Sequence, residues 1–164
     1  METAYLLLTF VRNDGRQLQM GCGCPIKVAK ISGIESPDYS VHTASSAVEP
    51  GSYVAGKKVE EREISVTFGV DDWQNRELYR AQIVSFFNPT KSYTLRLNWC
   101  YKQVQIGCEL QGFKFSEIES MWGILEGKLD LLCPYPYWSD LDNFGKNIAA
   151  ITAQWAWTVS FAAL

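Results

Sequence analysis

Cysteine, histidine and paired carboxylates are the side chains of this 164-residue chain that could bind a metal ion or transfer protons. Cys22 and Cys24 form a C-x-C in the sequence GCGCP, which could supply half of a zinc site, but zinc needs two further ligands. The single histidine, His42, lies in a polar segment without the signature of a nucleophile and base pair. We therefore expect no metal site and no catalytic site.

The acidic pairs Glu60–Glu61 and Asp71–Asp72 are better explained by local structure than by chemistry. The first pair precedes an alternating strand, and the second can cap a helix. The sequence contains neither a GxGxxG motif nor a P-loop, so a phosphate-binding cradle is not expected. These observations predict a protein that is not an enzyme and that binds no cofactor.

The five cysteines are expected to remain free thiols. The start of the chain lacks the basic leader and the small-residue cleavage site of a secretory signal, so we expect synthesis in the cytoplasm. An odd number of cysteines in a cytoplasmic product argues against a disulfide framework. Cys100, Cys108 and Cys133 fall within predicted strands, where a free cysteine behaves as a small hydrophobic residue.

The composition is that of a globular protein and excludes two classes of partner. The chain is 47% hydrophobic and 20% charged, and its net charge of −3 gives no electrostatic basis for nucleic-acid binding. The apolar segment 148–164 is interrupted by polar residues and is barely long enough to cross a bilayer. We interpret it as a strand and expect no membrane insertion.

Alternating apolar residues predict strands along most of the chain. In the clearest segment, Ile64, Val66, Phe68 and Val70 alternate with small or polar residues. An Asn-Asp-Gly turn after Phe10 predicts a hairpin in which Leu6, Leu8 and Phe10 face Leu18 and Met20. Strands are expected at 5–10, 17–20, 26–31, 64–70, 93–101, 104–110 and 125–133.

A single helix is expected from about residue 72 to 87. Asp71 or Asp72 can cap its start, and Asn88-Pro89 ends it. Its apolar face consists of Tyr79, Ile83, Phe86 and Phe87. The predicted fold is therefore mainly β with one flanking helix.

The segment from about 35 to 58 lacks a clear period and is interpreted as a long extended loop. Long loops inside compact domains are usually functional. Its second half displays glycine, apolar and basic residues that cannot pack on their own domain. These candidate binding residues are Gly51, Ser52, Tyr53, Val54, Gly56, Lys57 and Lys58.

The sequence PYPYWSD closes the predicted core. Its prolines favour an extended turn, and its aromatic residues could form an apolar clasp at the domain edge. The clasp consists of Pro134, Tyr135, Pro136, Tyr137 and Trp138. We expect a β domain over residues 1–140, followed by a connector and a terminal strand over 141–164.

The order of these segments resembles the phage distal tail protein family, in its N-terminal ring-forming domain, over residues 20–142. The family pattern before its strand is matched by the run from Gly51 to Ile64, in particular by Gly56, Lys57 and Arg62. Asn88-Pro89 matches the end of the family's helix, and the run from Cys133 to Tyr137 is similar to its closing CPDPYF.

The resemblance implies a structural protein of a phage or prophage virion. Such proteins resemble tail-tube subunits, with a β-sandwich or barrel and a flanking helix. They form a hexameric ring between the tail tube protein and the tail-tip or baseplate proteins. The exposed loop would then be the subunit interface of this ring, which closes by rotation. The chain ends before the carbohydrate-binding-like C-terminal module of many members, so we expect that module to be absent.

A monomeric carbohydrate-binding β-sandwich is the alternative. In that interpretation Trp99, Tyr101 or Trp122 would stack on sugar rings. Aromatic residues at alternating strand positions more often belong to a core, so the ring subunit is the favoured hypothesis.

Overall fold

The computed structural model describes residues 6–47, 50–99, 102–116 and 125–141. This part of the chain contains ten strands and one helix. No helix in it is long and apolar enough to cross a membrane. The elements are β1 (Leu6–Arg12), β2 (Gln17–Gly21), β3 (Ile26–Ser32), β4 (Tyr39–Ser45), β5 (Ser52–Val59), β6 (Arg62–Val70), α1 (Arg76–Phe86), β7 (Ser92–Trp99), β8 (Lys102–Phe115), β9 (Leu125–Cys133) and β10 (Ser139–Asp140).

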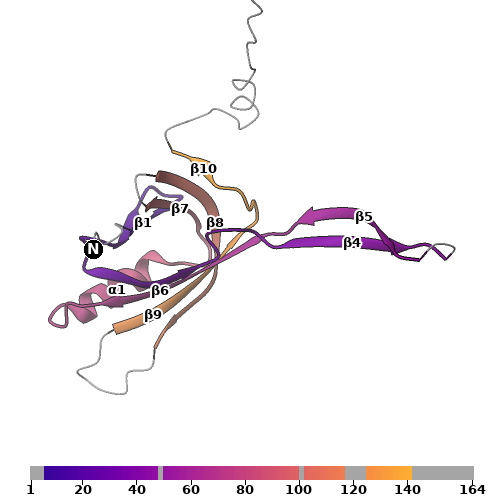
Figure 1. Cartoon of the computed structure of the whole chain (residues 1–164). Coiled ribbons are helices and arrows are strands. Elements are labelled where there is room, and N and C mark those ends of the chain that lie inside the picture. Colours follow the sequence, from indigo (N-terminus) through magenta and orange to yellow (C-terminus); the bar gives the residue numbers. More distant parts are fainter. Residues whose placement is uncertain (1–5, 48–49, 100–101, 117–124, 142–164) are drawn as a thin grey trace, which may run out of the picture.

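Eight strands form one antiparallel sheet in the order β2-β1-β7-β8-β9-β6-β3, and β10 pairs with β8 beside this path. The two ends of the order, β2 and β3, are consecutive in the chain and are joined only by residues 22–25. The sheet therefore bends until its ends approach each other, and Figure 1 shows the strong curvature of β8. We call this sheet together with α1 the body.

The core lies inside the curved sheet, on the faces that the period-two pattern predicted. In β6, Ile64, Val66, Phe68 and Val70 are buried, with exposed fractions of at most 2%. The predicted β1–β2 hairpin is confirmed, and in it Leu8 pairs with Met20 and Phe10 with Leu18. The prediction of a mainly β fold with one helix is confirmed.

Helix α1 begins at Arg76, four residues later than predicted. The Asp72 carboxylate accepts hydrogen bonds from the backbone N–H groups of Gln74 and Asn75, at 3.2 and 3.3 Å, and so holds a turn ahead of the helix. The predicted apolar face is confirmed: Ile83 and Phe86 are buried. Phe87, just after the helix, packs edge-to-face on Phe10 with ring centroids 5.3 Å apart.

The prediction of an irregular loop over residues 35–58 is wrong. Strands β4 and β5 form a separate two-stranded antiparallel sheet, which projects from the body (Figure 1). We call β4, β5 and their turn the arm. Both faces of the arm are largely exposed, so its sequence has no buried side that would impose alternation. The missing period reflected this exposure rather than an absence of strand.

Candidate functional site

The arm is a continuous ladder from Tyr39 opposite Val59 to Ser45 opposite Ser52. Its register shifts between His42 and Thr43, where Ala55 is the extra residue of a bulge. Gly51 lies in the turn with a φ of 114°, a conformation that favours glycine. The predicted interface residues thus belong to a regular strand and its turn.

The arm exposes large apolar side chains that the body does not cover. Tyr39, Val41, Tyr53 and Val54 have exposed fractions of 65, 52, 62 and 54%. An isolated two-stranded hairpin is only marginally stable in water. An arm of this length that projects with apolar side chains on it is therefore suited to contact another protein surface.

The register divides the predicted interface residues between the two faces of the arm. Residues opposite each other in the ladder share a face, so Val54 and Lys57 lie on the face of Val41. Tyr53, Gly56 and Lys58 lie on the other face. One flat contact could not engage all of them.

A polar cluster holds the arm where it leaves the body. The Glu60 carboxylate accepts hydrogen bonds from Ser40 Oγ and Lys58 Nζ, both at 2.7 Å. The hydrogen bond from Lys58, followed by that from Ser40, lowers the pKa of Glu60. The Glu60 backbone N–H donates to the carbonyl of Asp38 at 2.8 Å, so the two strands are joined at this point. Lys58 therefore contacts its own chain, whatever else it binds.

Arg62 anchors the arm to the body. It is only 4% exposed, and it donates from Nε to the Pro136 carbonyl at 2.8 Å and from Nη1 to the Gly33 carbonyl at 2.7 Å. Gly33 is the first residue of the link from β3 to β4, and Pro136 lies in the predicted clasp. A single buried guanidinium thus joins three segments. We call Gly33, Ile34, Arg62, Pro136 and Trp138 the neck.

The predicted clasp separates into an inner and an outer part. Pro136 is buried, and the Trp138 indole N–H donates to the Ile34 carbonyl at 3.1 Å, while the Arg62 guanidinium lies 5.9 Å from the indole ring. Pro134, Tyr135 and Tyr137 are exposed, and the two tyrosine rings pack edge-to-face at 5.3 Å. The inner residues hold the neck, and the outer ones form an exposed aromatic surface beside it.

Gly33 and Arg62 were missed as site residues by the sequence interpretation. Gly33 has a φ of 83°, and a Cβ there would overlap the carbonyl oxygen of Glu63 on the neighbouring strand. Arg62 occupies an inward position of the same alternation as Ile64 and Val66. That signal was available, since a charged residue in phase with a buried face needs buried partners.

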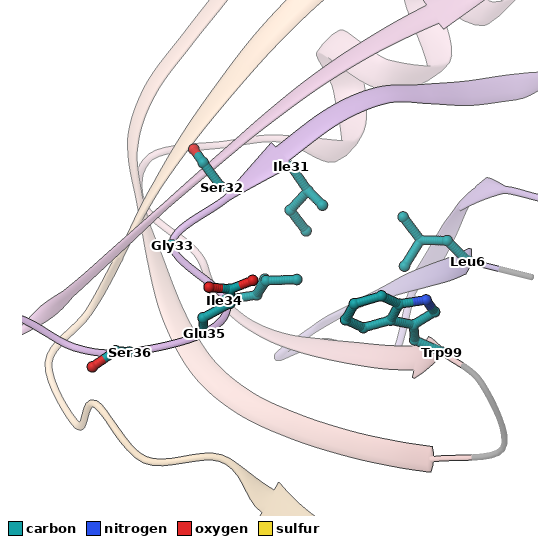
Figure 2. A pocket seen from close by; sticks show the side chains of 8 residues that line it. All are labelled: Leu6, Ile31, Ser32, Gly33, Ile34, Glu35, Ser36 and Trp99. Carbon is teal, nitrogen blue, oxygen red and sulfur yellow. The ribbon is translucent and has the colours of Figure 1, made fainter. Parts of the chain in front are cut away.

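A pocket of about 730 Å³ lies beside the neck. It is lined by the end of β3 and the link to β4 on one side, and by Leu6 and Trp99 on the other (Figure 2). Trp99 is 43% exposed. The alternative hypothesis assigned sugar stacking to Trp99, Tyr101 or Trp122. Of these three residues the structure describes Trp99, because the other two lie outside the described residues. The predicted terminal strand within 141–164 lies almost wholly outside them as well.

Within the described ranges, the Cys22–Cys24 pair and His42 do not meet in one site. No group of three or more His, Cys, Asp or Glu side chains there could hold a metal ion. Cys22 is exposed and Cys24 half-buried, at the turn between β2 and β3. His42 lies on the arm, in β4, and not at this turn.

Comparisons with known proteins point to one family. Residues 13–133 match the family described as phage tail protein RIFT-related domain. The crystal structure of the Dit protein of phage SPP1, described as a hub adsorption apparatus, superposes with a TM-score of 0.59 at 14% identity. The match covers 81% of this chain and 52% of that protein. No curated protein matches the chain.

A structure of the phage P2 baseplate in its activated conformation with calcium is similar in fold. It superposes with a TM-score of 0.61 at 10% identity, covering 79% of this chain and 43% of the baseplate chain. The chain thus spans about half of the length of these two proteins. At these identities the likeness establishes the fold.

Proposed function

Because the chain belongs to the phage tail protein family with a RIFT-related domain, we propose that it is a subunit of the distal tail ring. This ring would join the tail tube to the tail tip or baseplate. Family membership confirms the resemblance inferred from the sequence. The similarity to a hub protein and a baseplate protein supports the position at the distal end of the tail.

The observation that carries the proposal is the arm. A second copy of the chain is the partner that we propose for it, because a projecting element that contacts a different surface of the next copy forms a ring when the rotation between copies closes. Tyr39, Val41 and Val54 supply apolar area on one face, and Tyr53 supplies it on the other. Such an arm would lie between two surfaces of its neighbour rather than on one.

The proposed ring contains six copies of the chain. It would contact the tail tube protein on one side and the tail-tip proteins on the other. The particle would be a phage or prophage virion. A structural role requires no catalytic or metal-binding group. The proposal therefore depends on assembly, which can be measured directly.

The test compares the assembly and the stability of arm variants. Replacing Tyr53 and Lys57 with alanine is expected to reduce ring formation at least tenfold, as measured by light scattering and by counting rings in electron micrographs. The melting temperature of the subunit should change by less than about 2 °C, because both side chains are exposed. Leu78→Ala, at an exposed apolar position of α1, is the matched control and should assemble normally.

Two results would overturn the proposal. One is a wild-type chain that remains monomeric at high concentration and forms no rings, alone or in particles. The other is unfolding of the subunit by Tyr53→Ala and Lys57→Ala, which would make the arm part of the body's core.

A further inference from the structure

Cys108 and Cys133 are brought opposite each other by the register of β8 and β9. The last pair of their ladder is Glu109 with Leu132, and one antiparallel step further lie Cys108 and Cys133. Residues opposite each other in antiparallel strands have Cα atoms about 4.5–5.5 Å apart. This range falls within the Cα separation that a disulfide spans.

The two thiols point toward each other inside the core. Cys108 is 2% exposed and Cys133 is fully buried. A hydrogen bond between the two side chains, with burial, raises the pKa of Cys108, and the same hydrogen bond lowers the pKa of Cys133. The charge of Arg62, which pairs with Cys133 across β6 and β9, also lowers the pKa of Cys133. Cys133 is thus the more readily ionised of the two thiols, and Cys108 lies directly beside it.

We propose that Cys108 and Cys133 are a reversible disulfide site, formed by exchange with a small disulfide such as oxidised glutathione. This inference concerns the chemistry of the body and does not depend on the proposed ring.

The exchange balances in two steps. The Cys133 thiolate attacks one sulfur of oxidised glutathione, forming a mixed disulfide and releasing one glutathione thiolate, which takes up the proton that Cys133 lost. The Cys108 thiolate then attacks the Cys133 sulfur and releases the second glutathione, which takes up the Cys108 proton. The protein sulfurs lose two electrons, and the glutathione disulfide gains them.

The position of the pair allows access despite its burial. Cys133 is the last residue of β9, and Pro134 follows it without a backbone N–H to extend the ladder. Opening this strand end exposes the thiols without unfolding the whole sheet. In a reducing cytoplasm the pair would remain as two thiols, and outside the cell it would oxidise.

Oxidation would also affect the neck. Cys133 lies next to Arg62 in the sheet, and three residues before the Pro136 carbonyl that Arg62 binds. A bond to Cys108 would hold the end of β9 and prevent this opening. The redox state of the surroundings would therefore determine how rigidly the neck holds the arm.

The test uses the full chain with Cys22, Cys24 and Cys100 replaced by serine, so that only the proposed pair remains. The chain is refolded in buffers of increasing oxidised-to-reduced glutathione ratio, then denatured in acid and alkylated. Refolding in the redox buffer removes burial as an obstacle to equilibration. We expect the alkylated thiols to fall from two to none per chain, with a peptide joining the segments around residues 108 and 133. The melting temperature should rise by roughly 5–10 °C.

The matched control adds Cys133→Ala to the same chain. It should retain Cys108 as one alkylated thiol, with no joined peptide and no rise in melting temperature on oxidation. The proposal is overturned if the folded chain keeps two alkylated thiols in the most oxidising buffer. It is equally overturned if glutathione remains attached to Cys133 without closing onto Cys108.

Discussion

The body and the arm are built from the same secondary structure but bury their side chains in opposite ways. In the body, inward residues of β6 and β9 such as Phe68 and Leu129 are fully buried. In the arm, Tyr39 and Tyr53 are each more than 60% exposed although they lie in regular strands. Backbone pairing alone therefore does not distinguish a strand of the core from a strand suited to binding. The two kinds of strand differ in how far their side chains are buried.

The neck explains how the two regions coexist. The arm contributes little burial to the body, so its direction depends on a few polar contacts around Arg62 and on the close approach of Gly33 to β6. Substitutions in the body should change folding, those on the arm should change assembly, and those in the neck should change both.

Removing an aromatic ring should lower the free energy of unfolding strongly in the body and hardly at all on the arm. Phe10→Ala should lower the free energy of unfolding by about 3–5 kcal/mol, because it leaves a cavity next to Phe87. Tyr39→Ala should lower it by less than about 0.5 kcal/mol. Urea unfolding followed by circular dichroism measures both. Similar losses for the two variants would show that the arm buries its aromatic side chains as the body does.

Adding one methyl group should destabilise the protein more in the neck than in the arm's turn. Gly33→Ala should cost roughly 3 kcal/mol, because its Cβ would overlap the Glu63 carbonyl in addition to the strained φ. Gly51→Ala has a strained φ but open space around it, and should cost about 1 kcal/mol. Thermal and urea unfolding of the pair give the difference. Equal values would show that backbone conformation, and not the approach to β6, sets the requirement at position 33.

Replacing the buried guanidinium should weaken the neck. Arg62→Met should cost about 2 kcal/mol, because the carbonyls of Gly33 and Pro136 lose a charged donor. Hydrogen exchange of the arm should also accelerate more than that of β9. Arg16→Met, at an exposed position of the β1–β2 turn, should change stability by less than about 0.5 kcal/mol. An Arg62→Met variant as stable as wild type would show that this guanidinium does not hold the neck.

The smallest effect is expected at Asp14, on the body's surface. The Arg12 guanidinium, which donates to Asp14 at 2.9 Å, holds the pKa of that carboxyl well below its usual range. The folded state thus binds this proton less readily than the unfolded state. Its stabilising contribution is present at neutral pH and is lost progressively as the pH falls below about 4.

Asp14→Asn should therefore be slightly less stable than wild type at pH 7 and nearly equal to it near pH 2. Unfolding free energies at both values measure this convergence, with Asp71→Asn as an exposed control outside the pair. A gap of constant size across the pH range would show that the carboxylate's charge is not what matters.

The sequence predicted the body well because its strands have one buried face. The alternation in β6 and the Asn-Asp-Gly turn between β1 and β2 identified the elements and their inward residues, and the structure adds the register of Leu8 with Met20. The apolar face of α1 was correct, although Asp72 caps a preceding turn and so delays the start of the helix. In these segments burial imposes a pattern that a single sequence can display.

The arm and the neck could not be predicted in the same way. The arm has no buried face of its own, and glycine, serine and lysine within it resemble loop composition. The neck depends on contacts between residues 33, 62 and 136, and nothing local marks their proximity. The meeting of Cys108 and Cys133 depends in the same way on the register of two strands.

The strand order also determines when the body can fold. Strands β7, β8 and β9 lie between β1 and β6 in the sheet, although β6 precedes all three in the chain. The β1–β2 hairpin and the β3–β6 pair therefore remain separate until the later meander enters between them. Such non-local pairing slows folding, typically to milliseconds or seconds. During synthesis, the arm's hairpin can close early, while the sheet that carries it must wait for residues 125–133 to leave the ribosome.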